Sequence, residues 1–140
     1  MTNSNFVSKW QASAPYLLSV LRITSACMFI LAGSMKIFAF PEGVPPKGGT
    51  VELMSQVGIG GVLEVFCGAL LLFGLFTRPT AFLMAGQMAV AYWQFHAPHS
   101  PWPTISGGVS AVLYCFIWLY ISAAGGGPWS VDVLRTKKNL

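Results

Sequence analysis

Three polar side chains that could take part in chemistry stand inside long apolar segments of this chain: Arg22, Glu64 and Gln87. Glu64 lies in "GIGGVLEVFCGALLLFGLF" (58–76), where every other residue is apolar or glycine. A charge near the centre of a lipid bilayer costs at least ~2.5–3.5 kcal/mol on insertion scales, so such residues are usually paired and often mark function. A guanidinium, a carboxylate and an amide together can bind the polar end of a ligand or exchange a proton.

The heights of these side chains along their helices predict an ion pair. With ~1.5 Å of rise per residue, Arg22 and Gln87 lie roughly 10 Å, and Glu64 roughly 18 Å, from the cytoplasmic ends of their helices. An arginine side chain can cover most of that difference. We therefore predict that Arg22 faces Glu64 inside the bundle and that Gln87 hydrogen-bonds to one of them. Three interpretations stay open: a salt bridge that fixes helix register, a ligand-binding or proton-handling site, and loose snorkelling.

Tyr114 and His96 are the remaining candidates for contact with a ligand. Tyr114 lies in the last apolar segment, and His96 lies where the third one meets the surface, at a cavity mouth or in a solvated loop. His96 and His99 have no acidic residue near them in the sequence, and two histidines do not suffice for a metal or haem site. The predicted ligand-binding residues are therefore Arg22, Glu64, Gln87, Tyr114 and His96, with no metal ligand and no assigned catalytic residue.

Four apolar segments must position these side chains. Of the 140 residues, 54% are hydrophobic and 9% are charged, whereas soluble domains carry about a quarter charged residues. A helix needs about 20 apolar residues to cross a bilayer. The predicted spans are 15–40, 54–76, 81–95 with a start near Pro79, and 105–124. Since proline-rich and glycine-rich stretches separate them, the predicted fold is an all-α integral membrane four-helix bundle.

The distribution of lysine and arginine predicts the orientation of the bundle, because short cytoplasmic loops are enriched in these residues. The two tails and the 77–80 turn carry Lys9, Arg78, Arg135, Lys137 and Lys138, whereas the opposite side offers Lys47 and Lys36, the latter expected to snorkel to the interface. We therefore expect cytoplasmic tails over 1–14 and 125–140 around a transmembrane domain over 15–124. The net charge of +4 suits anionic lipid headgroups and gives no case for nucleic acid.

Three stretches of the sequence together resemble one known family. They are "LRITSACMFILAGSMKI", "GVLEVFCGALLLFGLFTRPTAFLMAGQMAVAYWQFHAP" and "LYCFIWLYISAAGGGPWSVD". The glutamate in a glycine-rich second span, the "GLFTRP" turn, the histidine after the third span and the "GPWSVD" ending are the most specific features. With them, the chain from about residue 17 to residue 132 resembles the DoxX family of small four-helix membrane proteins.

The resemblance implies a multi-pass protein of the bacterial plasma (inner) membrane and implies much less about activity. The family takes its name from proteins linked to a thiosulfate:quinone oxidoreductase, and some relatives are associated with oxidant-defence complexes. By position, its recurring polar residues correspond to Arg22, Lys36, Glu64, Arg78 and His96. Where the family carries an Asn-Gly-Gly-Glu-like stretch, residues 106–109 are Ser-Gly-Gly-Val, which argues against a mechanism that needs two intramembrane carboxylates.

Two functional hypotheses follow from these observations. In the first, the chain is a redox-associated subunit that binds a quinone or a similar apolar ligand near Arg22 and Glu64. A membrane or peripheral redox partner then carries the electrons, because the sequence shows no haem, flavin or iron–sulfur ligation pattern and so no intrinsic cofactor is expected.

In the second hypothesis the chain is a non-enzymatic membrane scaffold, with the ion pair as a structural device. It would assemble with other proteins or with copies of itself through an exposed stripe of Ala81, Ala85 and Ala89. A transporter is less well supported, because no internal repeat or broken helix is visible. None of these hypotheses assigns a reaction to the chain.

Overall fold

The structure is a computed structural model that describes residues 2–46 and 48–138, so Lys47 of the orientation argument lies outside the described residues. The helices are α1 (Thr2–Ala12), α2 (Ala14–Phe38), α3 (Gln56–Phe73), α4 (Thr77–Ala91), the π-helix η1 (Tyr92–His96), α5 (Pro103–Ser106), α6 (Val109–Ala124) and α7 (Val131–Lys138). Among the described residues, the one extended pairing is an isolated bridge between Val44 and Gly49. The predicted all-α class is therefore confirmed.

The ends of the long helices follow from local sequence signals. Pro15 occupies the first turn of α2, where a missing N–H costs nothing. The Ser55 side chain caps α3 by accepting a hydrogen bond from the Gly58 N–H at 3.0 Å. Gly74 ends α3 with a positive φ of 68°, a conformation that a residue without a Cβ adopts at no steric cost.

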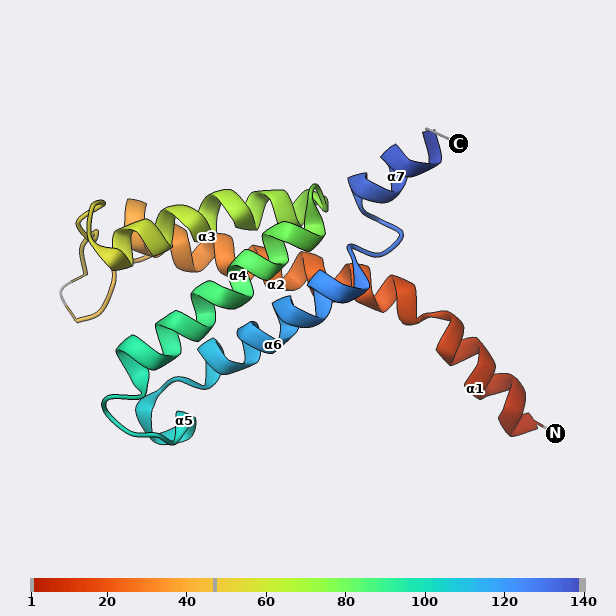
Figure 1. The fold of residues 1–140 in the computed structure, drawn as a ribbon, viewed down its shortest axis with the longest axis horizontal. Coiled ribbons are helices and arrows are strands. Elements are labelled where there is room, and N and C mark those ends of the chain that lie inside the picture. Colours follow the sequence, from red (N-terminus) through yellow and green to blue (C-terminus); the bar gives the residue numbers. More distant parts are fainter. Residues whose placement is uncertain (1, 47, 139–140) are drawn as a thin grey trace.

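Two of these helices, α2 and α3, are long and apolar enough to cross a membrane, and α6 is a shorter apolar helix. The 15-residue α4 is shorter still, but η1 continues it directly, so that helical backbone covers 77–96. A helix of that length spans about 30 Å, the thickness of the hydrocarbon core. The tails predicted over 1–14 and 125–140 contain α1 and α7, which project from the packed helices (Figure 1).

The closest helix pairing joins α2 to α3 through glycines. A Cβ added to Gly33 would lie 2.6 Å from the Gly61 carbonyl oxygen, and one added to Gly68 would lie 2.8 Å from Cγ1 of Ile30. Both distances are below van der Waals contact, so larger side chains would force the helices apart. This close approach fixes the height of each side chain on α2 relative to α3.

The second pair is α4 with α6, and the core lies between it and the α2–α3 pair. Phe29 of α2 packs edge-to-face on Trp118 of α6, with ring centroids 5.2 Å apart. Ala81 and Ala85 are also in this core, with exposed fractions of 0% and 4%. The prediction that these alanines form an exposed contact stripe is therefore wrong, because α6 already covers that face of α4.

Asp132 ties the short helix α7 to the start of α4. One carboxylate oxygen accepts a hydrogen bond from the Phe76 N–H at 2.9 Å and the other from the Thr77 N–H at 2.8 Å. The carboxylate thus satisfies two N–H groups that a helix start leaves without partners. Burial raises the pKa of Asp132, but the hydrogen bonds from Thr77 and Phe76, with the charge of Arg135, outweigh it and hold this pKa below its usual value.

Replacing Asp132 with alanine is expected to destabilise the protein by ~1 kcal/mol at neutral pH, the typical value of a lost helix cap. Because the pKa of Asp132 is lower in the folded state, its stabilising effect is complete above the unfolded value of about 3.9 and is lost as the pH falls through the folded value. Thermal unfolding of both proteins in detergent, measured from neutral to acidic pH, checks this. A difference that persists unchanged at about pH 2 would contradict the role of the carboxylate charge.

Candidate functional site

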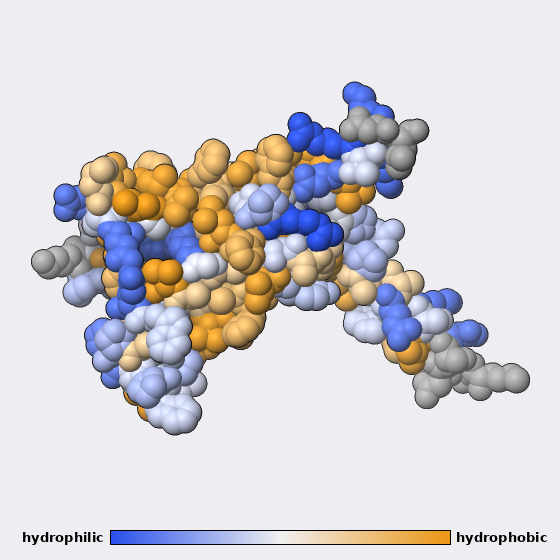
Figure 2. Space-filling model, in the orientation of Figure 1, coloured by the Kyte–Doolittle hydropathy of each residue, from blue (hydrophilic) through white to orange (hydrophobic). Residues whose placement is uncertain are grey.

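A cavity of about 840 Å³ lies between α3 and α4. The two helices are close at the end where they are joined and diverge toward their other ends (Figure 1), and Figure 2 shows hydrophilic side chains in the hollow between them, flanked by apolar ones. The apolar side chains of the lining are Val44, Val57, Ile59, Leu63, Phe82, Leu83, Val90, Ala91 and Phe95. The polar ones are Lys36, Gln56, Glu64, Gln87 and His96, and Gly60 and Gly86 complete the wall.

The floor of this cavity is an ion pair between Lys36 and Glu64. The Lys36 ammonium nitrogen lies 2.6 Å from Oε1 and 2.7 Å from Oε2 of Glu64. The side chain of Glu64 is 4% exposed and that of Lys36 is 26% exposed. The carboxylate is therefore enclosed by protein, whereas the ammonium group keeps an open side.

Gln87 completes the polar floor from α4. Its side-chain N–H₂ donates to Oε1 of Glu64 at 3.3 Å and to the Gly60 carbonyl at 3.1 Å. The predicted hydrogen bond between Gln87 and a member of the charged pair is therefore confirmed. The Gln87 carbonyl oxygen is buried and has no hydrogen-bond partner among the described residues.

The predicted pairing of Arg22 with Glu64 is wrong. Arg22 is fully buried next to Leu71, seven residues and about 10 Å along α3 from Glu64, which is beyond the reach of its side chain. Its guanidinium donates to the carbonyl oxygens of Leu71 at 2.5 Å, Leu72 at 2.6 Å, Gly126 at 2.8 Å and Trp129 at 2.9 Å. Carbonyls at the C-terminal end of a helix carry partial negative charge, so they bind this cation directly, and the Leu71 carbonyl does so while also accepting from the Gly74 N–H at 3.1 Å.

The sequence reasoning also missed the partner of Glu64. It treated Lys36 as an interfacial lysine that snorkels toward water, whereas Lys36 turns inward to the carboxylate. The signal that could have found it is the spacing of small residues. Gly33 of α2 packs against Gly61 and Glu64 of α3, and Gly61 in turn packs against Lys36, so the two charged side chains stand about one helical turn apart across this contact, within reach of each other.

The mouth of the cavity lies at η1. His96 lines it, and its Nδ1 donates to the Ser106 carbonyl at 3.1 Å, which leaves Nε2 of the neutral ring as an acceptor. Gln56 at the start of α3 hydrogen-bonds to Gln94 of η1 across the opening. π-helical turns are rare and frequently occur at functional sites, and this one turns His96 and Phe95 toward the cavity.

Tyr114 lies away from the cavity. Its ring packs edge-to-face on Phe29, with centroids 4.8 Å apart, on the α2 and α6 side of the core. The structure thus brings together three of the five predicted residues, Glu64, Gln87 and His96, and adds Lys36 to them. Groups of three or more histidine, cysteine, aspartate or glutamate side chains that could hold a metal ion are absent from the described residues.

Fold and site together define an all-helical chain that has two helices long and apolar enough to cross a membrane and an apolar cavity beside a buried ion pair. The sequence matches the family described as DoxX over residues 17–97. The chain therefore belongs to the DoxX family.

Two bacterial relatives match nearly the full length of the chain. An uncharacterized protein of Haemophilus influenzae is 37% identical over 127 residues, covering 89% of this chain and 94% of the relative. The inner membrane protein YqjF of Escherichia coli is 30% identical over 135 residues, covering 85% of this chain and 92% of the relative. No solved structure gives a significant match.

Proposed function

We propose that this chain is a multi-pass protein of the bacterial inner membrane that binds a quinone-like apolar ligand in the cavity between α3 and α4. In this proposal α2, α3, α4 with η1, and α6 cross the bilayer, and both termini face the cytoplasm. The chain acts as a redox-associated subunit, and a membrane or peripheral partner supplies the electrons. The inner-membrane location of the relative YqjF and the apolar length of α2 and α3 support the setting.

The observation that carries the proposal is the position of the Lys36–Glu64 ion pair at the floor of an apolar cavity. Ligand sites are typically apolar with a few convergent polar groups. An ammonium group has three N–H donors, and Lys36 uses two of them on Glu64, which leaves one for the carbonyl oxygen of a quinone. Phe82, Leu83 and Val90 would contact the ring and tail.

The same floor offers hydrogen-bond partners to both the oxidised and the reduced form of such a ligand. A quinone only accepts hydrogen bonds and would bind to Lys36, whereas a hydroquinone also donates, and Glu64 is an acceptor within the same site. His96, at the mouth, offers a second acceptor to the far oxygen of a ring that fills the cavity. Because both forms find partners, the site can hold the ligand while a partner changes its oxidation state.

The scaffold hypothesis explains the ion pair but leaves the cavity without a role. If Lys36 and Glu64 only held α2 against α3, the space beside them could be filled by side chains at no cost. Instead Gly86 stands at the cavity wall, and a Cβ added there would meet no atom within 4 Å. An open apolar space with polar groups converging at its floor is typical of a ligand site, so its presence beside the charges favours an occupant.

Replacing Gly86 with leucine is expected to remove most of the bound ligand without disturbing the fold, because the new side chain points into open cavity space. The measurement is the amount of quinone extracted per mole of protein purified in mild detergent, identified by mass spectrometry. The matched control is Ser110→Leu, which adds a leucine at an exposed position of α6 outside the cavity. It should retain the wild-type quinone content.

The proposal fails if wild-type protein carries no quinone and binds none when ubiquinone or menaquinone is added. It fails equally if Gly86→Leu and Ser110→Leu retain the same amount. In either case the Lys36–Glu64 pair would be a structural device, and the scaffold, alone or as a homo-oligomer, would become the favoured function.

A further inference from the structure

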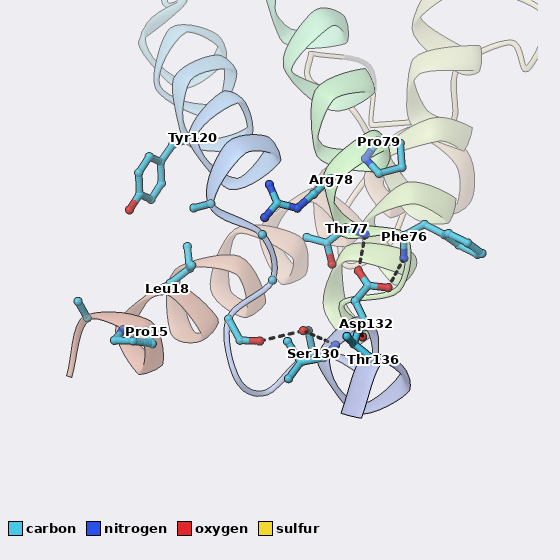
Figure 3. Close-up of a pocket in the computed structure, with 16 residues that line it drawn as sticks. Pro15, Leu18, Phe76, Thr77, Arg78, Pro79, Tyr120, Ser130, Asp132 and Thr136 are labelled. Atoms are coloured by element: carbon cyan, nitrogen blue, oxygen red, sulfur yellow. Dashed lines mark hydrogen bonds between the residues drawn. The ribbon is translucent and has the colours of Figure 1, made fainter. Parts of the chain in front are cut away.

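A second cavity, of about 740 Å³, lies at the opposite end of the helices from η1. The start of α2, the start of α4, the C-terminal end of α6 and the first turn of α7 surround it (Figure 3). None of its lining residues also lines the cavity between α3 and α4. It is therefore a separate space, to which the proposed function assigns no role.

Arg78 supplies a cation to this cavity. Its Nη1 donates to the carbonyl oxygens of Ser122, at 3.3 Å, and Ala123, both in the last turn of α6. Figure 3 shows the Arg78 side chain extending from α4 toward that end of α6. Among the described residues, Nε and Nη2 make no hydrogen bond, so one edge of the guanidinium is free for a second partner. An open guanidinium edge matches two oxygens of a phosphate group.

Thr77 and Asp132 supply further polar groups of the wall, beside Ser130 and Thr136. Thr77 is 1% exposed, and its hydroxyl is buried with no partner within hydrogen-bond distance among the described residues. Asp132 already binds the two free N–H groups at the start of α4. A cation and an anion on one cavity match a zwitterionic headgroup better than a simple anion.

An apolar part of the wall belongs to the outer surfaces of α2 and α6. Leu18 of α2 is half-buried, and Tyr120 and Ala124 of α6 are exposed. These two helices are among the proposed membrane spans, so this side of the cavity faces lipid. A free phosphate ion would gain nothing from such a wall, whereas an acyl chain would bury apolar surface against it.

We propose that this cavity binds a phospholipid, with its phosphate at Arg78 and an acyl chain along Leu18 and Tyr120. Tyr120 then stands at the level of the headgroups, where aromatic side chains with a polar end are enriched in membrane proteins. The lipid fills the space between α2, α4 and α6 that the chain itself leaves open.

Titration of the delipidated full-length protein with phosphatidylethanolamine, followed by native mass spectrometry, tests this assignment. Arg78→Gln is expected to weaken lipid binding about tenfold, the size of a lost charge-assisted hydrogen bond. Because this change also removes the contact to α6, a second variant is needed. Ala124→Trp fills the cavity from an exposed position, leaves Arg78 in place, and should reduce binding as much. Lys137→Gln, the charge-matched control on α7, should bind as the wild type does.

Two comparison ligands show which part of the lipid the cavity recognises. Diacylglycerol, which has the chains without the phosphate, should bind at least about tenfold more weakly than phosphatidylethanolamine. Inorganic phosphate should not displace the lipid. The assignment is overturned if diacylglycerol binds equally well, if inorganic phosphate displaces the lipid and so identifies a site for the free anion, or if Arg78→Gln and Ala124→Trp bind as the control does.

Discussion

Replacing Lys36 with methionine is expected to lower the free energy of unfolding by about 3–5 kcal/mol, because removal of one partner leaves the other as an uncompensated buried charge. Methionine preserves the length of the side chain, so the packing against Gly61 is largely kept. The remaining Glu64 is 3% exposed and would retain only the weak hydrogen bond from Gln87. Denaturant unfolding in detergent micelles, followed by circular dichroism, measures the effect.

The double variant Lys36→Met, Glu64→Leu is the control. Well-packed apolar residues in place of a buried ion pair are often neutral or stabilising, so the double variant should recover most of the lost stability. It should not recover quinone binding. Recovery of stability without recovery of binding would show that the pair serves a ligand site and not stability alone. Wild-type stability in the single variant would contradict the ion pair, as would rescue of Glu64→Arg by Arg22→Glu, because Arg22 and Glu64 do not meet.

Replacing Arg22 with methionine is expected to cost at least about 3 kcal/mol and to lower the yield of folded protein. A hydrogen bond to a charged group contributes about 1.5–3 kcal/mol, and buried carbonyls left without a donor add a penalty. Arg22 is fully buried and binds four carbonyls, two at the end of α3 and two in the segment before α7. Unfolding in detergent, together with yield after size-exclusion chromatography, measures the loss.

Two variants show what is specific to Arg22. Arg22→Lys keeps the charge but loses the planar fork of donors, so it should restore only part of the stability. Arg135→Met removes a cation from the exposed face of α7, where it lies 5.8 Å from the Phe76 ring, and should cost less than about 1 kcal/mol. Full rescue by lysine would show that the charge alone matters and that the four directed hydrogen bonds do not.

The all-helical class and the two longest apolar helices could be predicted from the sequence, because apolar length and turn residues determine where helices form. The predicted first span, 15–40, becomes α2 over Ala14–Phe38, and the second, 54–76, becomes α3 over Gln56–Phe73. The π-helical end of α4 was not predicted, because nothing in the periodicity of "YWQFH" distinguishes a π turn from an α turn.

The site could be predicted only in part. Glu64 and Gln87 were found because a polar residue in an apolar span stands out whatever its neighbours are. Their partner was not found, because pairing depends on the relative heights of two helices, which rise per residue alone does not determine. The height is determined by the contact of Gly33 with Gly61, and small residues elsewhere in the span, such as Ala26, offer alternative registers from sequence alone.

The binding partner of Arg22 could not be predicted from the sequence either. A buried guanidinium suggests a carboxylate partner, but backbone carbonyls at a helix end carry partial negative charge, and Arg22 donates to four carbonyls instead. Tyr114 was likewise placed at the site from its span alone, although the face of α6 that it occupies packs on Phe29.

Because α2 packs closely on α3, and α4 on α6, the contact between these two pairs is where we expect relative motion. Hydrogen bonds hold the two pairs together at one end. There Arg22 joins α3 to the 126–129 segment, and Asp132 joins α7 to α4. At the other end, among the described residues, the Gln56 to Gln94 hydrogen bond spans the opening. We expect the two helix pairs to move as rigid units about the Arg22 end, so that the space between them widens at η1. A hydrophobic molecule could then enter laterally from the bilayer while each pair stays packed.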